Sequence, residues 1–142
     1  MAHTITGHTI INGSRNLVLQ FNIISDAASG QYSDYPLIDI TDYTGADQIQ
    51  PNNYKVMKIS GRNGVGTSFQ LKFGNTAGDH KLFFESTADN EFYENWTAGG
   101  GLSPLLADPD MTIRITTLGF DAANDTISLT IWLKKKTQNP SS

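Results

Sequence analysis

The sequence predicts an all-β fold, an antiparallel β-sandwich of about eight strands in a single domain, of either the jelly-roll or the immunoglobulin-like type. The composition favours strands and turns: the 142 residues include 15 Thr, 13 Gly and 11 Asn, and the acids are 11 Asp against 3 Glu. Apolar residues alternate with polar ones in segment after segment, each bounded by Gly, Asn or Asp. A chain of this length buries enough surface to hold one core without disulfides.

The N-terminal part predicts a hairpin. Residues 4–11 and 15–25 flank Asn12-Gly13, a dipeptide that favours a tight turn between antiparallel strands. In the second segment Leu17, Leu19, Phe21 and Ile23 fall on one face. Residues 1–12 are read either as the first strand or as an N-terminal arm.

The middle of the chain predicts four more strands. Residues 37–40 form a short one, and residues 54–60, 68–73 and 81–85 follow, separated by the glycine-rich loop 61–66 and the turn 74–79. We expect the last three to form a meander, with each strand paired to the next.

Residues 91–104 break the alternating pattern and predict a long connection rich in aromatics and glycine. Aromatic residues in a loop either fold back over the open end of the sheets or are buried by a partner. We expect the first arrangement for Phe92, Tyr93 and Trp96.

The C-terminal part again alternates. Residues 111–116 and 126–134 predict two strands joined by a hairpin loop at 119–125, and Trp132 falls on the polar face of the second. The run Lys134–Lys136 is interpreted as a solubilising cluster that protects a sheet edge. The predicted sandwich domain covers residues 13–136, and residues 137–142 form a polar C-terminal tail.

Charge and composition exclude several classes of protein. A formal charge of −4 argues against a nucleic-acid surface, which requires a basic face. Neither a signal peptide nor an apolar run of membrane-spanning length is seen, so we expect a soluble protein made in a cytoplasm, with no membrane partner. The absence of Cys excludes thiolate metal sites and a catalytic thiol.

No motif indicates an enzyme, a metal or a cofactor. His3, His8 and His80 lack the spacing of metal ligands, and the Asp and Asn clusters are better explained as turn residues than as calcium ligands. Glu85, Glu91 and Glu94 do not predict a paired-carboxylate cleft. We therefore expect a protein without catalytic activity.

The remaining signal is a surface suited to binding. Trp132, the loop aromatics and the tyrosines Tyr32, Tyr35 and Tyr43 supply the amphipathic contact area that interfaces use. Exposed aromatics also stack on sugars, so a carbohydrate-binding module is an alternative.

Several stretches resemble a family of small virion proteins of tailed bacteriophages. Residues 4–18, TITGHTIINGSRNLV, are similar to the family's TITGTT…DGSRNVVV start. The similarity continues through residues 37–40, the GGGLSP that ends the aromatic loop, and the two closing segments 113–120 and 126–134. It spans nearly the whole domain and rests on strands and turns rather than on chemically specific motifs.

The resemblance implies a capsid decoration or cement protein on the virion surface that binds the major capsid protein. A neck or tail component acting in host adsorption is the nearest variant. A homo-oligomer is expected, with a trimer favoured because symmetric shells present three-fold points. Residues chosen for partner binding come from the first segment, the aromatic loop and the last strand: Ile5, Ile10, Ile11, Phe92, Tyr93, Trp96 and Trp132.

Overall fold

A computed structural model of the chain describes residues 4–13, 15–26, 31–44, 51–64, 66–87, 90–104, 109–120 and 125–137. Within these residues the chain forms nine strands and two short 3-10 helices. Their bounds, in chain order, are β1 (Thr4–Asn12), β2 (Asn16–Ile24), β3 (Tyr35–Asp39), η1 (Ile40–Asp42), β4 (Pro51–Asn63), β5 (Ser68–Asn75), β6 (Lys81–Ser86), β7 (Asn90–Asn95), η2 (Thr97–Gly99), β8 (Pro109–Leu118) and β9 (Thr126–Thr137).

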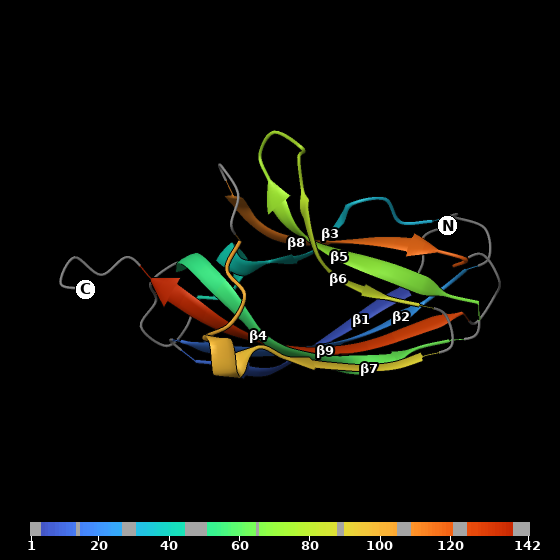
Figure 1. Ribbon diagram of the computed structural model, residues 1–142, viewed down its shortest axis with the longest axis horizontal. Helices are drawn as coiled ribbons and strands as arrows, with labels where there is room; N and C mark the ends of the chain where they lie inside the picture. Colours follow the sequence, from blue (N-terminus) through green and yellow to red (C-terminus); the bar gives the residue numbers. More distant parts are fainter. Residues whose placement is uncertain are drawn as a thin grey trace.

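The strands form two antiparallel sheets that pack face to face as a sandwich (Figure 1). The first sheet has five strands in the order β1-β2-β9-β4-β7, and the second has four in the order β3-β8-β5-β6. This confirms the predicted single-domain all-β sandwich.

The strand pairs identify which kind of sandwich it is. β2 pairs with β9, β3 with β8, β4 with β7 and β5 with β6, so the chain is one long hairpin whose two arms are rolled together across both sheets. This nested order is that of the jelly roll, and it excludes the immunoglobulin-like alternative. β1 lies outside the eight jelly-roll strands and extends the first sheet by one.

Hairpins that the turn chemistry predicts are present. Asn12-Gly13 joins β1 to β2, and the backbone N–H of Gly13 donates to the Asn16 carbonyl at 2.9 Å. The turn between β5 and β6 is held by His80, whose Nδ1 accepts from the Asn75 backbone N–H at 2.9 Å.

Two predicted pairings are wrong. β4 pairs with β9 and β7, whereas β5 and β6 lie in the other sheet, so the expected meander of three strands does not form. β8 and β9 also belong to different sheets, so they do not form the predicted hairpin. The alternation of apolar and polar residues identifies a strand and its buried face. Which strands pair depends on contacts between segments that are far apart in the sequence.

The aromatic segment contains a strand rather than only a connection. Asn90–Asn95 forms β7, which pairs with β4 along the edge of the first sheet. The regular alternation there is short, which explains why the sequence pattern alone predicts an irregular segment.

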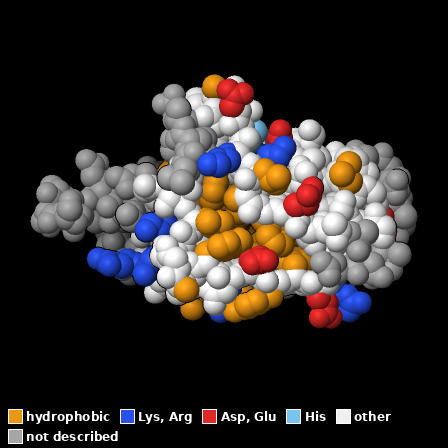
Figure 2. All heavy atoms as spheres, in the orientation of Figure 1, with side chains coloured by type: hydrophobic (Ala, Val, Ile, Leu, Met, Phe, Trp, Pro, Cys, Tyr) orange, Lys and Arg blue, Asp and Glu red, His pale blue; other side chains and the backbone are white. Residues whose placement is uncertain are grey.

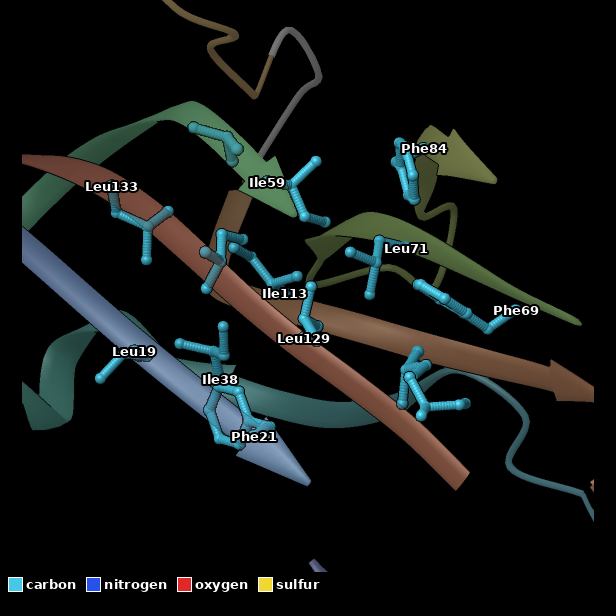
Figure 3. Packing of buried hydrophobic residues seen from close by; sticks show 14 of the residues in the cluster. Leu19, Phe21, Ile38, Ile59, Phe69, Leu71, Phe84, Ile113, Leu129 and Leu133 are labelled. Carbon is cyan, nitrogen blue, oxygen red and sulfur yellow. The ribbon is translucent and has the colours of Figure 1, made fainter. Parts of the chain in front are cut away.

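Inward-facing residues of both sheets fill the space between them (Figure 3). Leu19, Phe21 and Leu129 of the first sheet meet Ile38 and Ile113 of the second, and all are buried. Burying a side chain of this size contributes about 1.5–3 kcal/mol, so this layer supplies most of the stabilising free energy.

The lysine run does not protect a sheet edge, and Lys135 is not a surface residue. β9 lies in the middle of the first sheet, and Lys135 is only 3% exposed. Its Nζ donates to the Asn12 side-chain oxygen at 2.6 Å and to the Tyr43 carbonyl at 2.7 Å. Lys135 therefore ties the last strand to the end of β1 and to the residue that follows η1, while Lys134 is exposed as predicted.

Candidate docking face

The outer face of the first sheet is uncharged over most of the three neighbouring strands β1, β2 and β9, up to the exposed Lys134 near the end of β9. Because the core residues of β2 and β9 occupy alternate positions, the intervening side chains and their partners on β1 point away from the core. We call these residues the neutral face: Thr4, Thr6, His8, Ile11, Val18, Gln20, Asn22, Ile24, Thr126, Ser128, Thr130 and Trp132.

An apolar row crosses the neutral face. Ile11 lies opposite Val18, and Val18 lies opposite Trp132, so three strands contribute one side chain each. Val18 is only 6% exposed although it lies on the outer face and outside the core cluster. Ile11 and Trp132 flank Val18 on the neighbouring strands, and we call this row of three side chains the ridge.

Polar residues beside the ridge bond to one another. The Ser128 hydroxyl donates to the Asn22 side-chain oxygen at 3.0 Å, and the Gln20 amide donates to the same oxygen at 3.4 Å. A surface whose polar groups already have partners loses less hydration when a partner covers it.

A cation limits one end of the ridge. Lys58 of β4 lies opposite Trp132, and its Nζ is 4.4 Å from the centroid of the Trp132 ring. The positive charge is attracted by the electrons of the ring face. One face of the indole is thus already occupied by a side chain of the same molecule.

The outer face of the second sheet has the opposite character. Lys72 of β5 lies opposite Arg114 of β8, and each cation has its own carboxylate. The Lys72 Nζ is 2.8 Å from an Asp34 oxygen, and an Arg114 nitrogen is 2.9 Å from an Asp110 oxygen. This charged network is half-exposed and internally neutralised, which suits a face that remains in water.

The network also holds both carboxylates in their ionised form. The Lys72 ammonium bonds to Asp34 and lowers the pKa of that carboxyl, assisted by the Thr116 hydroxyl. Burial alone would raise the pKa of Asp110, but hydrogen bonds from Thr112 and Arg114 outweigh it and lower that pKa as well.

The three isoleucines predicted for partner binding all lie on β1. Ile5 faces inward and packs against the core, half-buried. Ile10 is 57% exposed at a shift in the β1–β2 register, and Ile11 is 48% exposed on the neutral face. Residues Thr4–Asn12 thus form a first strand, which is one of the two interpretations that the sequence allowed for this segment.

The loop aromatics separate into three environments. Phe92 is 8% exposed, and its ring centroid lies 5.2 Å from that of Phe69, so it belongs to the core and not to the surface. Trp96 is half-buried against the core at the end of β7. Tyr93 is 60% exposed on the outer face, opposite Ser60 of β4. Trp96, which follows β7, packs against the core as expected of a loop aromatic, whereas Phe92 reaches the core as part of strand β7 and Tyr93 stays exposed.

The structure brings Ile11 and Trp132 together through Val18, which the sequence-based choice omitted. The signal was available: the buried series at Leu17, Leu19, Phe21 and Ile23 places Val18 on the opposite face. Its proximity to Ile11 and Trp132 depends on the register of two strand pairs, which the pattern of one segment does not contain.

A second apolar surface lies where β6 and β7 form one side of the sandwich. Figure 2 shows hydrophobic side chains gathered between the two sheets on this side. Phe83 of β6 is half-buried against the core, as are Trp96 and Leu102, which follow β7. The core reaches the surface here because both sheets end at these two strands.

The described ranges contain no group of three or more His, Cys, Asp or Glu residues that could hold a metal ion. No helix in the same ranges is long and apolar enough to cross a membrane.

Comparisons with known proteins do not identify a relative of this chain. No protein-family model, no curated protein and no solved structure matches this chain.

Proposed function

We propose that this chain is a non-enzymatic virion structural protein of the capsid decoration type, which docks on the major capsid protein through the neutral face. The proposal joins the resemblance of residues 4–18 and the two closing segments to phage virion proteins with a surface suited to docking. The jelly roll is compatible with this role because it recurs in viral capsid domains, although a fold alone does not fix a function.

The observation that carries the proposal is the contrast between the neutral face and the outer face of the second sheet. The second sheet presents a network of charges at Asp34, Lys72, Asp110 and Arg114, whereas the neutral face contains no Lys, Arg, Asp or Glu. Charged side chains on the outer side of the first sheet lie beside the neutral face, at Lys134, at Lys58 and at the Arg62–Glu91 pair. Interface centres are depleted of charged residues relative to the rest of a protein surface. Covering the neutral face therefore costs less desolvation than covering the opposite one.

The low overall charge agrees with this reading. Charged residues make up 17% of the chain, against about 25% in ordinary soluble domains. A surface poor in charge suits a protein that is covered by neighbours in an assembly.

The test uses particles stripped of this protein, to which purified chain is added back. We expect the wild type to cosediment with the particles and to restore their resistance to heat and osmotic shock. Gln20→Arg, at the centre of the neutral face, should abolish cosedimentation. Gln70→Arg makes the same change on the outer face of the second sheet and should bind as the wild type does.

Two results would contradict the proposal. One is that stripped particles retain full resistance without the protein. The other is that Gln70→Arg and Gln20→Arg reduce binding equally, because the docking face would then not be the neutral face.

A carbohydrate-binding role is the second candidate, and the presence of Trp132 and Tyr93 beside amide and hydroxyl side chains on one face of the first sheet favours it. The position of Lys58 over the Trp132 ring argues against sugar stacking on that side. A glycan array with wild type, Trp132→Ala and Trp96→Ala separates the two functions. Specific sugar binding that is lost in Trp132→Ala would favour this second role over capsid docking.

A further inference from the structure

β1 is an accessory strand that contributes little to the core. It lies outside the eight strands of the jelly roll, and within the described residues it pairs only with β2. Eight of its nine residues are exposed, and Ile5 is the one that packs against the core. Thr9 is exposed although it lies on the inner side, so this part of β1 extends beyond the cover of the second sheet.

Each of the other three edge strands carries a feature that discourages further strand pairing. β7 has Glu91 and Glu94, β3 has Pro36, and β6 has Lys81 and Glu85. Charges and prolines on edge strands are the usual means by which proteins prevent edge-to-edge association.

β1 has no such protection over most of its length. Its sequence, TITGHTIIN, contains no Lys, Arg, Asp, Glu or Pro. A shift in register between Thr9 and Ile11 disturbs its last part, which leaves Thr4–Thr9 as a regular strand. An exposed, uncharged edge of this length is a template for the addition of another strand.

We propose that β1 pairs with β1 of a second copy of this chain, antiparallel, about a two-fold axis that passes through Thr4–Thr9. A strand that adds to this edge must itself be extended and unprotected, and among the edges of the described sheets only β1 meets that condition. Two such strands close a symmetric pair in which no like charges face each other. A dimer of this kind replaces the trimer favoured from the sequence.

The pairing joins the two first sheets into one sheet of ten strands, five from each copy. The neutral faces of the two copies then become continuous across the axis, since β1 forms the margin of each. The inference does not depend on the docking role, because it concerns the association of the isolated chain with itself.

The chain contains no cysteine, so single cysteines report the pairing directly. We would prepare Thr4→Cys, Thr6→Cys and His8→Cys, each on the exposed outer side of β1, and oxidise them alone and in pairwise mixtures. Glu91→Cys on β7, at the opposite edge of the same sheet, is the matched control. Residues directly opposite each other in an antiparallel pair have Cβ atoms close enough to form a disulfide.

We expect disulfide-linked dimers from the β1 variants and none from Glu91→Cys. The position or mixture that crosslinks fastest gives the register, since a residue on the axis faces its own copy. Sedimentation equilibrium should show a wild-type dimer and a dissociation constant raised about tenfold or more by Thr6→Lys. An equimolar mixture of Thr6→Lys and Thr6→Glu should restore the dimer.

A wild type that stays monomeric, or β1 cysteines that crosslink no faster than the β7 control, would overturn the inference. A trimer that survives Thr6→Lys would also overturn it. Recovery in the mixture shows that the Thr6→Lys chain is folded, so loss of the dimer is not confused with loss of structure.

Discussion

Lys58 lies over the ring of Trp132, with its Nζ 4.4 Å from the ring centroid, although the two residues are separated by much of the chain. They meet because β4 and β9 are neighbours and place these residues opposite each other. The contact marks where the neutral face ends and the cationic side of β4 begins.

We predict a measurable coupling between these two residues. Lys58→Ala should lower the free energy of unfolding by about 0.5–1 kcal/mol, because the contact is half-exposed. Urea unfolding of the two single variants and the double variant Lys58→Ala/Trp132→Leu should give a coupling of the same size. Lys55→Ala, opposite Lys134 on the same face, is the control. A coupling of zero would show that the contact contributes nothing to stability.

A second prediction concerns Lys135, which bonds to Asn12 and to the Tyr43 carbonyl. Lys135→Met keeps the length of the side chain but removes both bonds, so the free energy of unfolding should fall by about 1–3 kcal/mol. Lys134→Met changes the exposed neighbour and should stay within about 0.5 kcal/mol of wild type. Equal effects of the two substitutions in chemical unfolding would disprove a structural role for Lys135.

Gly61 of β4 is the third test. A Cβ at this residue would collide with the Ser128 carbonyl oxygen and approach the Phe92 ring at 2.8 Å, and its φ of 156° is rare for other residues. Gly61→Ala should therefore destabilise the protein by about 3 kcal/mol or more. Gly99→Ala is the control, because no atom lies within 4 Å of a Cβ there. Similar melting temperatures for the two variants would contradict the close approach of β4 and β9.

The charged network predicts how stability depends on pH. Hydrogen bonds lower the pKa of Asp34 and Asp110 below the ordinary value of 3.8, so both carboxylates stabilise the folded state when ionised. Their contribution should be fully present above about pH 5 and should be lost as the pH falls below about 4. Asp34→Asn/Asp110→Asn should be less stable at neutral pH and should lose less stability on acidification. The free energy of unfolding is measured by urea unfolding as a function of pH. If it falls as steeply in acid for the double variant as for the wild type, the two carboxylates do not stabilise the folded state in this way.

Local patterns in the sequence determined the strands and their buried faces. The alternation at Leu17, Leu19, Phe21 and Ile23 placed one face of β2 in the core, and Asn12-Gly13 placed the first hairpin. These features depend on the alternation of side chains along a strand and on turn conformation, and both are determined by residues close together in the sequence.

Strand partners and the composition of the surface were decided only by the tertiary structure. Nothing near β4 in the sequence pairs it with β9, and nothing in the lysine run separates the buried Lys135 from the exposed Lys134. The same holds for Phe92, which its segment suggested as a surface residue and the rolled sheets placed in the core. Such choices depend on contacts between segments far apart in the chain, whose energies the local pattern does not contain. The sequence by itself therefore specified a β-sandwich poor in charge, and the jelly-roll pairing decided which uncharged residues share one face.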